Sequence, residues 1–262
     1  MAVGRVLPDA VVFVLSSGRA HDVPEDHLGP VEEGILSVDR YAAYKATDAV
    51  KEGRIVLAYC WAHVRRDFLE LARSWPEQES WALGWVERIG LLYQANTARL
   101  EVREEPVAFT QKDQLLRQQV ATMCAQAEEE LAKPAILPAC RQVLTSLQTH
   151  WSGLTVFVEH PDVPMDNNAA ERVLRGPVVG RKNYYGSGSV WSGELAALMF
   201  SIFQTLCLWK INPRLWLTAY LESCASHGGH APGDVTGFLP WNASSEQLLA
   251  WGVPPTVKAD SS

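Results

Sequence analysis

The spacing of apolar residues divides the chain into a strand-rich beginning and a long helical remainder. Three short apolar runs rich in β-branched residues, each bounded by Gly, Pro, Asp or Ser, predict strands at 10–15, 35–38 and 55–59. From Trp61 onward the period changes, and the first helical stripe consists of Trp61, Val64, Phe68 and Leu71. Similar stripes predict helices within 80–150 and over about 195–209. The pattern therefore predicts a mostly helical α/β protein.

Local signals refine the third quarter of the chain and its end. Asn168 stands three residues before Glu171, which is typical of a helix N-cap and its capping box, and predicts a short helix through about Arg175. After about Gly228 the composition is typical of loop and tail.

Composition places the chain among folded proteins. Ten Trp, seven Phe and seven Tyr in 262 residues supply more large apolar surface than a disordered chain carries. Five scattered cysteines form no disulfide framework, and the early apolar run at 10–15 is too short for a signal peptide or a membrane span. We therefore expect a cytoplasmic protein with no membrane contact.

The charge distribution carries more information than the net charge. A formal net charge of −7 argues against a protein that coats nucleic acid nonspecifically. Yet the stretch from 172 to 193 contains no acid and holds four cations: Arg172, Arg175, Arg181 and Lys182. Asn183 and Tyr184 follow, and cations interleaved with amides and aromatics suit a phosphate backbone and exposed bases. A solvated basic loop is the other interpretation.

Two acids stand where functional groups are often presented. Asp39 directly follows the strand at 35–38, and a carboxylate at the end of a buried strand is a common functional position, although Asp39 could also cap the next short helix. Glu171 shares a helix face with Arg175, or it merely completes the capping box. Cys60 and His63 have half of a zinc-like spacing with no second pair, which makes a zinc site improbable.

Five motifs occur in an order that resembles a known family. They are Ser37-Val-Asp-Arg-Tyr-Ala-Ala-Tyr44, Cys60-Trp-Ala-His-Val-Arg-Arg66, Asp166-Asn-Asn-Ala-Ala-Glu-Arg172, Gly180-Arg-Lys-Asn183 and Leu239-Pro-Trp-Asn242. Together they resemble the catalytic part of the insertion-sequence-66 family of transposases, over roughly residues 10–242.

The resemblance implies a fold and a domain organisation. It implies an α/β, mostly helical protein with a ribonuclease H-like core that is incomplete at its N-terminal end and carries a large all-helical insertion. The implied parts are the partial core strands at 1–64, the helical insertion at 65–160, the core helices with the Glu motif at 161–226, and a loop and tail at 227–262.

The resemblance also implies the chemistry. Asp39 matches the second acid of an Asp-Asp-Glu triad and Glu171 matches its Glu, so both become expected catalytic residues and ligands of Mg²⁺ or Mn²⁺. Hard divalent cations favour such carboxylate oxygens on rigid elements. The expected partners are transposon-end and target DNA, held by Arg172, Arg175, Arg181, Lys182 and Tyr184. A homodimer or a complex with a full-length transposase is expected by analogy, in the cytoplasm of a bacterium.

One departure from the family sets the alternatives. The first Asp of the triad normally lies in an Asp-Glu-Thr segment on a first, central strand, and the sequence contains no Asp-Glu-Thr. The run at 10–15 instead looks like the third strand of the fold, so we expect a truncated transposase. The alternatives are an inactive remnant that binds DNA or a full-length transposase, and a helical interaction protein in which Asp39 and Glu171 only cap helices.

Overall fold

The fold comes from a computed structural model that describes residues 2–6, 9–16, 22–183 and 188–254. Contacts divide the chain into two compact units. The first unit comprises Met1–Gly18 and Ala169–Ser262, and the second comprises Arg19–Asn168. Each unit contains one two-stranded sheet and its own buried cluster of apolar side chains.

The sheet of the second unit is a parallel pair. Strand β3 (Gly34–Val38) pairs with β4 (Ile55–Tyr59), and Val38 stands opposite Tyr59 at the end of both strands. Helices α2 (Ala42–Lys45) and α3 (Asp48–Lys51) connect them, and α1 (Asp22–Leu28) precedes them. Leu28, Val38 and Ile55 are buried between these elements. Because the carboxyl ends of parallel strands lie at the same end of a sheet, which we call its carboxyl edge, residues 39 and 60 both follow the strands there.

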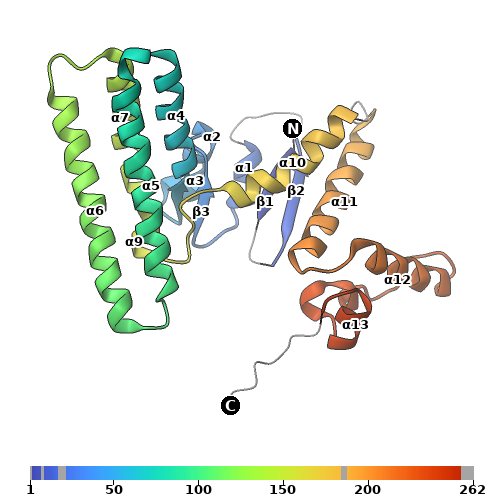
Figure 1. The fold of residues 1–262 in the computed structure, drawn as a ribbon. Helices are drawn as coiled ribbons and strands as arrows, with labels where there is room; N and C mark the ends of the chain where they lie inside the picture. The colour runs from blue at the N-terminus through green and yellow to red at the C-terminus, as the bar shows by residue number, and fades with distance from the viewer. Residues whose placement is uncertain (1, 7–8, 17–21, 184–187, 255–262) are drawn as a thin grey trace. The chain divides into compact units, whose positions relative to one another are not determined.

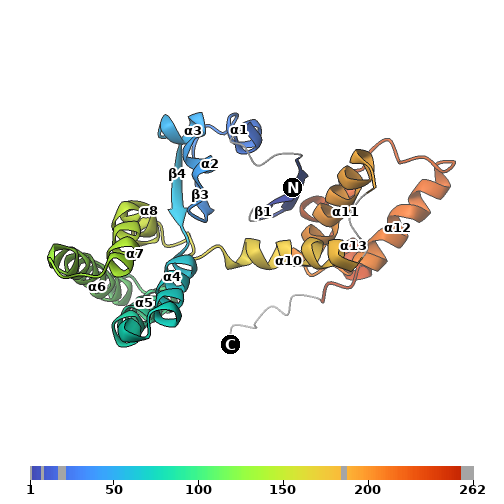
Figure 2. The same cartoon turned by 90° about the horizontal axis from the view of Figure 1, so that it is seen from above.

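A helical block follows β4 in the same unit. Its long helices are α4 (Trp61–Ser74), α5 (Glu79–Glu101), α6 (Pro106–Ala132) and α7 (Pro138–Thr149). The 3₁₀ turn Pro76–Gln78 and the short helices α8 (Trp151–Leu154) and α9 (Val156–Glu159) complete it. Figures 1 and 2 show α4, α5, α6 and α7 standing side by side next to β3 and β4.

The predicted apolar stripes form the core of this block. Trp61, Phe68 and Trp85 are fully buried, and the ring of Phe68 stacks on that of Trp85 with centroids 5.4 Å apart. The core also encloses the guanidinium of Arg99, a charge that no pattern along the chain marks. It donates to Asp113 at 2.8 Å, to Asn96 at 2.7 Å, and to the backbone carbonyls of Phe157 and Val158. These contacts offset most of the cost of burying the charge, although Nε of Arg99 has no hydrogen-bond partner among the described residues.

The first unit is a hairpin packed on one long helix. Strand β1 (Ala2–Val6) pairs antiparallel with β2 (Val11–Leu15), and α11 (Val190–Leu208) lies along β2 (Figure 1). Two hydroxyls of α11 bind the strand backbone. Thr205 Oγ1 accepts from the Val11 N–H at 3.0 Å, and Ser201 Oγ accepts from the Phe13 N–H at 2.8 Å.

The remaining elements of this unit follow α11 or precede it. They are α10 (Asn168–Asn183), α12 (Pro213–Ser226), the 3₁₀ turns Thr236–Phe238 and Pro240–Asn242, and α13 (Ser245–Ala250). Trp216 and Trp251 anchor the buried cluster beneath α12 and α13.

Four sequence-based expectations need correction. A strand, β1, precedes the run at 10–15, and its Ala-Val-Gly-Arg-Val sequence is too short and mixed to stand out. Helix α10 continues through Pro177 to Asn183 instead of ending near Arg175, and Asn168 is its first helical residue and not its cap. The stretch after Gly228 contains α13, which is started by a capping box of Ser244 and Gln247.

The mostly helical α/β class, with a small parallel sheet, is confirmed. The ribonuclease H-like core and the domain boundaries stay predictions. By length and composition, the described residues include one helix apolar enough to cross a membrane, α11, and that helix packs against β2.

Candidate functional site

Asp39 lies at the carboxyl edge of the parallel pair. It is the first residue after β3, and Cys60 is the first after β4. The backbone N–H of Cys60 donates to the carbonyl of Val38 at 3.2 Å, which extends the ladder one residue past the strands. Asp39 therefore stands on a backbone fixed by regular pairing, where a functional side chain can be held rigidly.

The carboxylate of Asp39 is half-buried and only partly engaged. Its Oδ1 accepts from the Tyr41 N–H at 3.0 Å in a local turn. The N-cap of α2 is Tyr41 and no side chain caps that helix, so the alternative in which Asp39 caps it is wrong. The neighbouring cation Arg40 is directed elsewhere, to Asp67 at 2.5 Å and to Ser146 at 2.8 Å. Within the described residues, Oδ2 of Asp39 accepts no hydrogen bond. One oxygen thus remains available to a ligand.

The segment that leads into α10 is attached to this same edge. The Trp61 N–H donates to the Met165 carbonyl at 2.9 Å, and the Asn167 N–H donates to Cys60 Sγ at 3.4 Å. Burial raises the pKa of the Cys60 thiol, more than its backbone hydrogen bonds lower it. The thiol is therefore neutral, which fits a packing role better than a nucleophile or a metal ligand.

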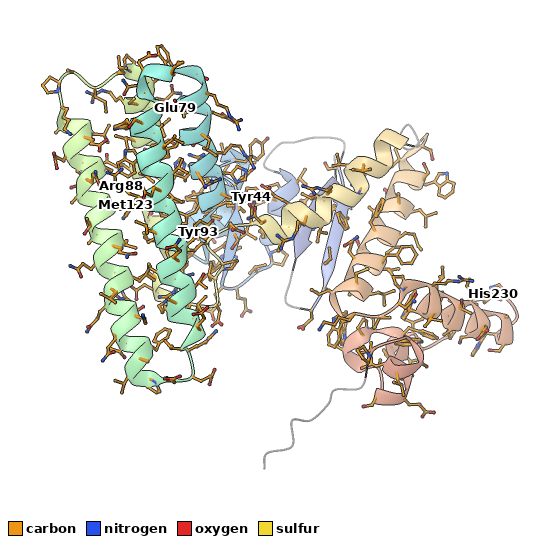
Figure 3. The ribbon with its side chains drawn as sticks, viewed as in Figure 1. Tyr44, Glu79, Arg88, Tyr93, Met123 and His230 are labelled. Carbon is orange, nitrogen blue, oxygen red and sulfur yellow. The ribbon has the colours of Figure 1, made fainter. Side chains whose placement is uncertain are left out.

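The carboxylate of Asp166 is shared between two partners. Its Oδ1 accepts from the Asn168 N–H at 3.0 Å, and its Oδ2 accepts from the Tyr93 hydroxyl at 3.2 Å. Figure 3 labels Tyr93 on α5. Burial, and secondly the charge of Asp166, raise the pKa of the Tyr93 phenol, so that it remains a hydrogen-bond donor.

Glu171 lies in the first turn of α10, half-buried, and Arg172 and Arg175 are exposed on the same helix. Arg181 and Lys182 belong to the last turn of α10, and their side chains are not described. Tyr184 lies outside the described residues. Four of the candidates are thus brought onto one helix with Glu171, while Asp39 belongs to the other unit.

No three His, Cys, Asp or Glu side chains gather closely enough to hold a metal ion among the described residues. Asp39 and Glu171 stay the ligands predicted from the sequence. Their carboxylate chemistry suits a hard divalent cation, and the open Oδ2 of Asp39 fits that use.

A pocket of about 410 Å³ lies in the helical block, against β4. Its rim includes Arg117, which is committed to Asp113 at 2.6 Å and to Glu159 at 2.5 Å. None of the candidate residues lines this pocket, so it does not mark the proposed chemistry.

Sequence reasoning missed the residues that support the site. Asp166 stands inside a motif that carries the family resemblance, so its position could have drawn attention to it. Tyr93 binds Asp166, which is 73 positions away, and Arg40 binds Asp67, which is 27 positions away. No pattern along the chain marks such pairs.

Comparisons with known proteins agree with the motifs. A profile of the Transposase IS66 family matches residues 2–195. Three similar proteins come from Sinorhizobium fredii, and all are described as uncharacterized. Protein y4jD is 27% identical over 92% of this chain and 47% of its own length. Protein y4hP is 29% identical over 86% of this chain and 42% of its own length. Protein y4qI is 29% identical over 94% of this chain and 45% of its own length.

The chain thus spans less than half the length of these curated relatives. No solved structure matches it. The family profile covers both candidate acids and most of the chain, and on that match the chain belongs to the Transposase IS66 family.

Proposed function

We propose that this chain supplies Asp39 and Glu171 to the active site of an Asp-Asp-Glu transposase that cleaves and joins mobile-element DNA. Membership of the family supports the reaction class. The observation that carries the assignment is the carboxyl edge of β3 and β4, where Asp39 keeps one open oxygen and where the segment directly before Glu171 is attached. In a helix, Glu171 follows Asn168 by a rise of about 4.5 Å, so that attachment limits where Glu171 can go.

Asp39 and Glu171 would hold Mg²⁺ or Mn²⁺. When bound, the metal activates a water or a DNA 3′-hydroxyl and stabilises charge at phosphorus. The chain's own contribution is to present the two carboxylates and to keep Arg40 engaged with Asp67, so that Arg40 does not pair with Asp39. Arg172 and Arg175, exposed beside Glu171, would bind the phosphates of the scissile strand, and Arg181, Lys182 and Tyr184 would extend that contact.

The third carboxylate of the family triad has no matching motif in this sequence. We propose that a segment carrying the Asp-Glu-Thr motif must act together with this chain, which would make the present chain a truncated form by itself. Pairing of two transposon ends would then require a second copy or a full-length transposase, in the bacterial cytoplasm.

The test is a cleavage and strand-transfer assay with transposon-end DNA, in Mg²⁺ or Mn²⁺, using the chain with and without that upstream segment. Activity should require both parts, and Glu171→Gln or Asp39→Asn should lower it at least about 100-fold because a metal ligand is lost. Glu70→Gln, an exposed acid on α4, is the matched control and should retain activity. Robust activity from the chain alone, unaffected by Glu171→Gln, would refute the ligand assignment.

A second candidate is a non-catalytic remnant that binds DNA or a full-length transposase. It is favoured by the sequence, which contains no Asp-Glu-Thr motif for the first acid of the triad. Such a remnant would bind transposon-end DNA without metal-dependent cleavage, even with the upstream segment present. Arg172→Ala and Arg175→Ala should each weaken that binding and lower its salt dependence by about one phosphate contact, whereas the exposed Arg214→Ala should not. If neither Arg172→Ala nor Arg175→Ala changes DNA binding, a purely structural role is favoured.

A further inference from the structure

We propose that Tyr93 and Asp166 are positioning residues that fix the start of α10 and, through it, Glu171. The inference rests on the proposed function for the role of Glu171, but the contacts that carry it lie wholly within the second unit. It assigns the helical block a part in the active site, since Tyr93 belongs to α5.

The start of α10 is held by three separate contacts. Two of them join it to the end of β4 and the start of α4, through the Met165 carbonyl and the Asn167 N–H. The third is the carboxylate of Asp166, whose two oxygens serve two elements at once. Oδ1 binds the Asn168 N–H, an amide that no helical carbonyl can satisfy because it lies in the first turn. Oδ2 binds the Tyr93 hydroxyl.

This third contact differs from the other two in what it constrains. The two contacts to Cys60 and Trp61 fix residues 165 and 167, which precede the helix. Asp166 fixes the first helical amide itself, and it is in turn held by Tyr93. A hydrogen bond to an ionised carboxylate is stronger than one between neutral groups. Tyr93 therefore restricts rotation of Asp166, and Asp166 restricts the backbone at the first residue of α10.

The direction of the first turn decides where Glu171 points. Successive helical residues turn by about 100°, so Glu171 keeps a fixed orientation only if the backbone at Asn168 is fixed. Supporting groups of this kind typically affect metal affinity when they are removed, although they never touch the metal.

The test compares Tyr93→Phe and Asp166→Ala with Tyr59→Phe in the full chain. Tyr59 is a matched control because it packs on the same core and its hydroxyl has no hydrogen-bond partner among the described residues. Amide hydrogen exchange over 167–175 should accelerate about tenfold in Tyr93→Phe and Asp166→Ala and should be unchanged in Tyr59→Phe. Asp166→Asn should restore exchange close to that of the wild type, because its amide can still accept from Asn168 and can donate to Tyr93.

Unchanged exchange over 167–175 in Tyr93→Phe, or an equal acceleration throughout residues 19–168, would overturn the proposal. The second readout is broadening of the amide signals of Glu171 and Arg172 by Mn²⁺. Tyr93→Phe should raise the Mn²⁺ concentration needed for it severalfold, and Tyr59→Phe should not. If Mn²⁺ broadens neither Glu171 nor Arg40 in the wild type, the metal assignment fails, while the exchange result still decides the positioning role.

Discussion

The helical block of the second unit and helix α11 of the first treat their apolar residues in opposite ways. In the block, Trp85 is fully buried and the apolar stripe faces inward. On α11, Trp191 is 67% exposed and Leu198 is 56% exposed, while the polar Thr205 is buried against β2. The block therefore holds itself together by packing, whereas the contact of α11 with β2 adds two hydroxyl hydrogen bonds to the packing of Phe13 on Phe200.

This difference separates the two candidate acids. Asp39 stands on a sheet that is backed by a packed core, so its backbone is fixed without help. Glu171 lies in the first turn of α10, and the start of that turn depends on specific polar contacts. One substitution can remove a polar contact, whereas one substitution in a packed core lowers the free energy of unfolding by a larger amount. We therefore expect mutations to affect the two units by different amounts.

The largest effect should come from the charge buried in the helical block. Arg99→Ala would leave Oδ1 of Asp113 and the carbonyls of Phe157 and Val158 without their donor, which should cost about 3–5 kcal/mol of unfolding free energy. Urea unfolding followed by hydrogen exchange should show the loss in residues 19–168. Arg103→Ala removes an exposed ion pair with Asp162 and should cost less than about 1 kcal/mol. Equal losses in the two variants would show that the block does not depend on Arg99.

The next effect concerns the contact between α8 and β4. A methyl group at Gly153 would clash with the ring of Tyr59 and would lie 2.7 Å from the Leu57 carbonyl oxygen, which is part of the sheet and cannot move aside. Gly153→Ala should therefore cost about 1–3 kcal/mol, measured as a lower thermal midpoint.

Gly90→Ala is the matched control for this substitution. A methyl group there has no neighbour within 4 Å, and Gly90 lies inside α5. Alanine should raise stability by about 0.5–1 kcal/mol, because glycine loses more backbone entropy on helix formation. The two substitutions should thus change the free energy of unfolding in opposite directions. A change in the same direction would contradict the packing seen at Gly153.

The first unit should respond to loss of a hydroxyl. Thr205→Val keeps the shape of the side chain but leaves the buried Val11 N–H without an acceptor, which should cost about 1–3 kcal/mol. The loss should show as faster exchange in β2 and α11, with the helical block unchanged. Thr218→Val, at an exposed position on α12, should have little effect. If Thr205→Val is neutral, the apolar contacts of α11 outweigh its polar ones, and the contrast between the units is smaller than described.

The sequence predicted the regular elements well where one periodicity dominates. The strands at 34–38 and 55–59 and the helices of the block were expected from their apolar runs, and the structure confirms them. It predicted α11 as a helix, but its apolar residues are not all inside: Leu195 and Leu198 are exposed while Thr205 is buried. A hydroxyl that binds a strand backbone is invisible to a pattern that ranks residues by hydropathy.

The candidate site was predictable only in part and for a similar reason. Asp39 and Glu171 were found because each stands at a recognisable end of an element and within a family motif. Their roles stay predictions. Tyr93, which supports Asp166, lies 73 residues away in a helix whose pattern indicates only a buried face. Long-range polar contacts depend on how elements are packed together, and one sequence holds no record of that packing.

The smallest effect should be a pH dependence confined to the second unit. Burial lowers the pKa of His150, and the charges of Lys45 and Arg40 lower it further against a backbone hydrogen bond that raises it. The Lys45 ammonium lies 2.7 Å from Nε2, and Nδ1 lies 2.7 Å from the Ser146 carbonyl, so the neutral ring donates from Nδ1 and accepts at Nε2. The folded state thus binds a proton less readily than the unfolded state does.

Stability should therefore fall as the pH drops below the ordinary histidine pKa of about 6.5 toward the depressed folded value, and should rise again with pH. The loss should be small, since the ring is half-exposed. Nuclear magnetic resonance titration of the His150 ring should give a pKa below the ordinary histidine value of about 6.5. Lys45→Met should raise the pKa of His150 only partly, because burial is the larger cause. A complete return to the ordinary value would mean that Lys45, and not the packing of this unit, sets the protonation of His150.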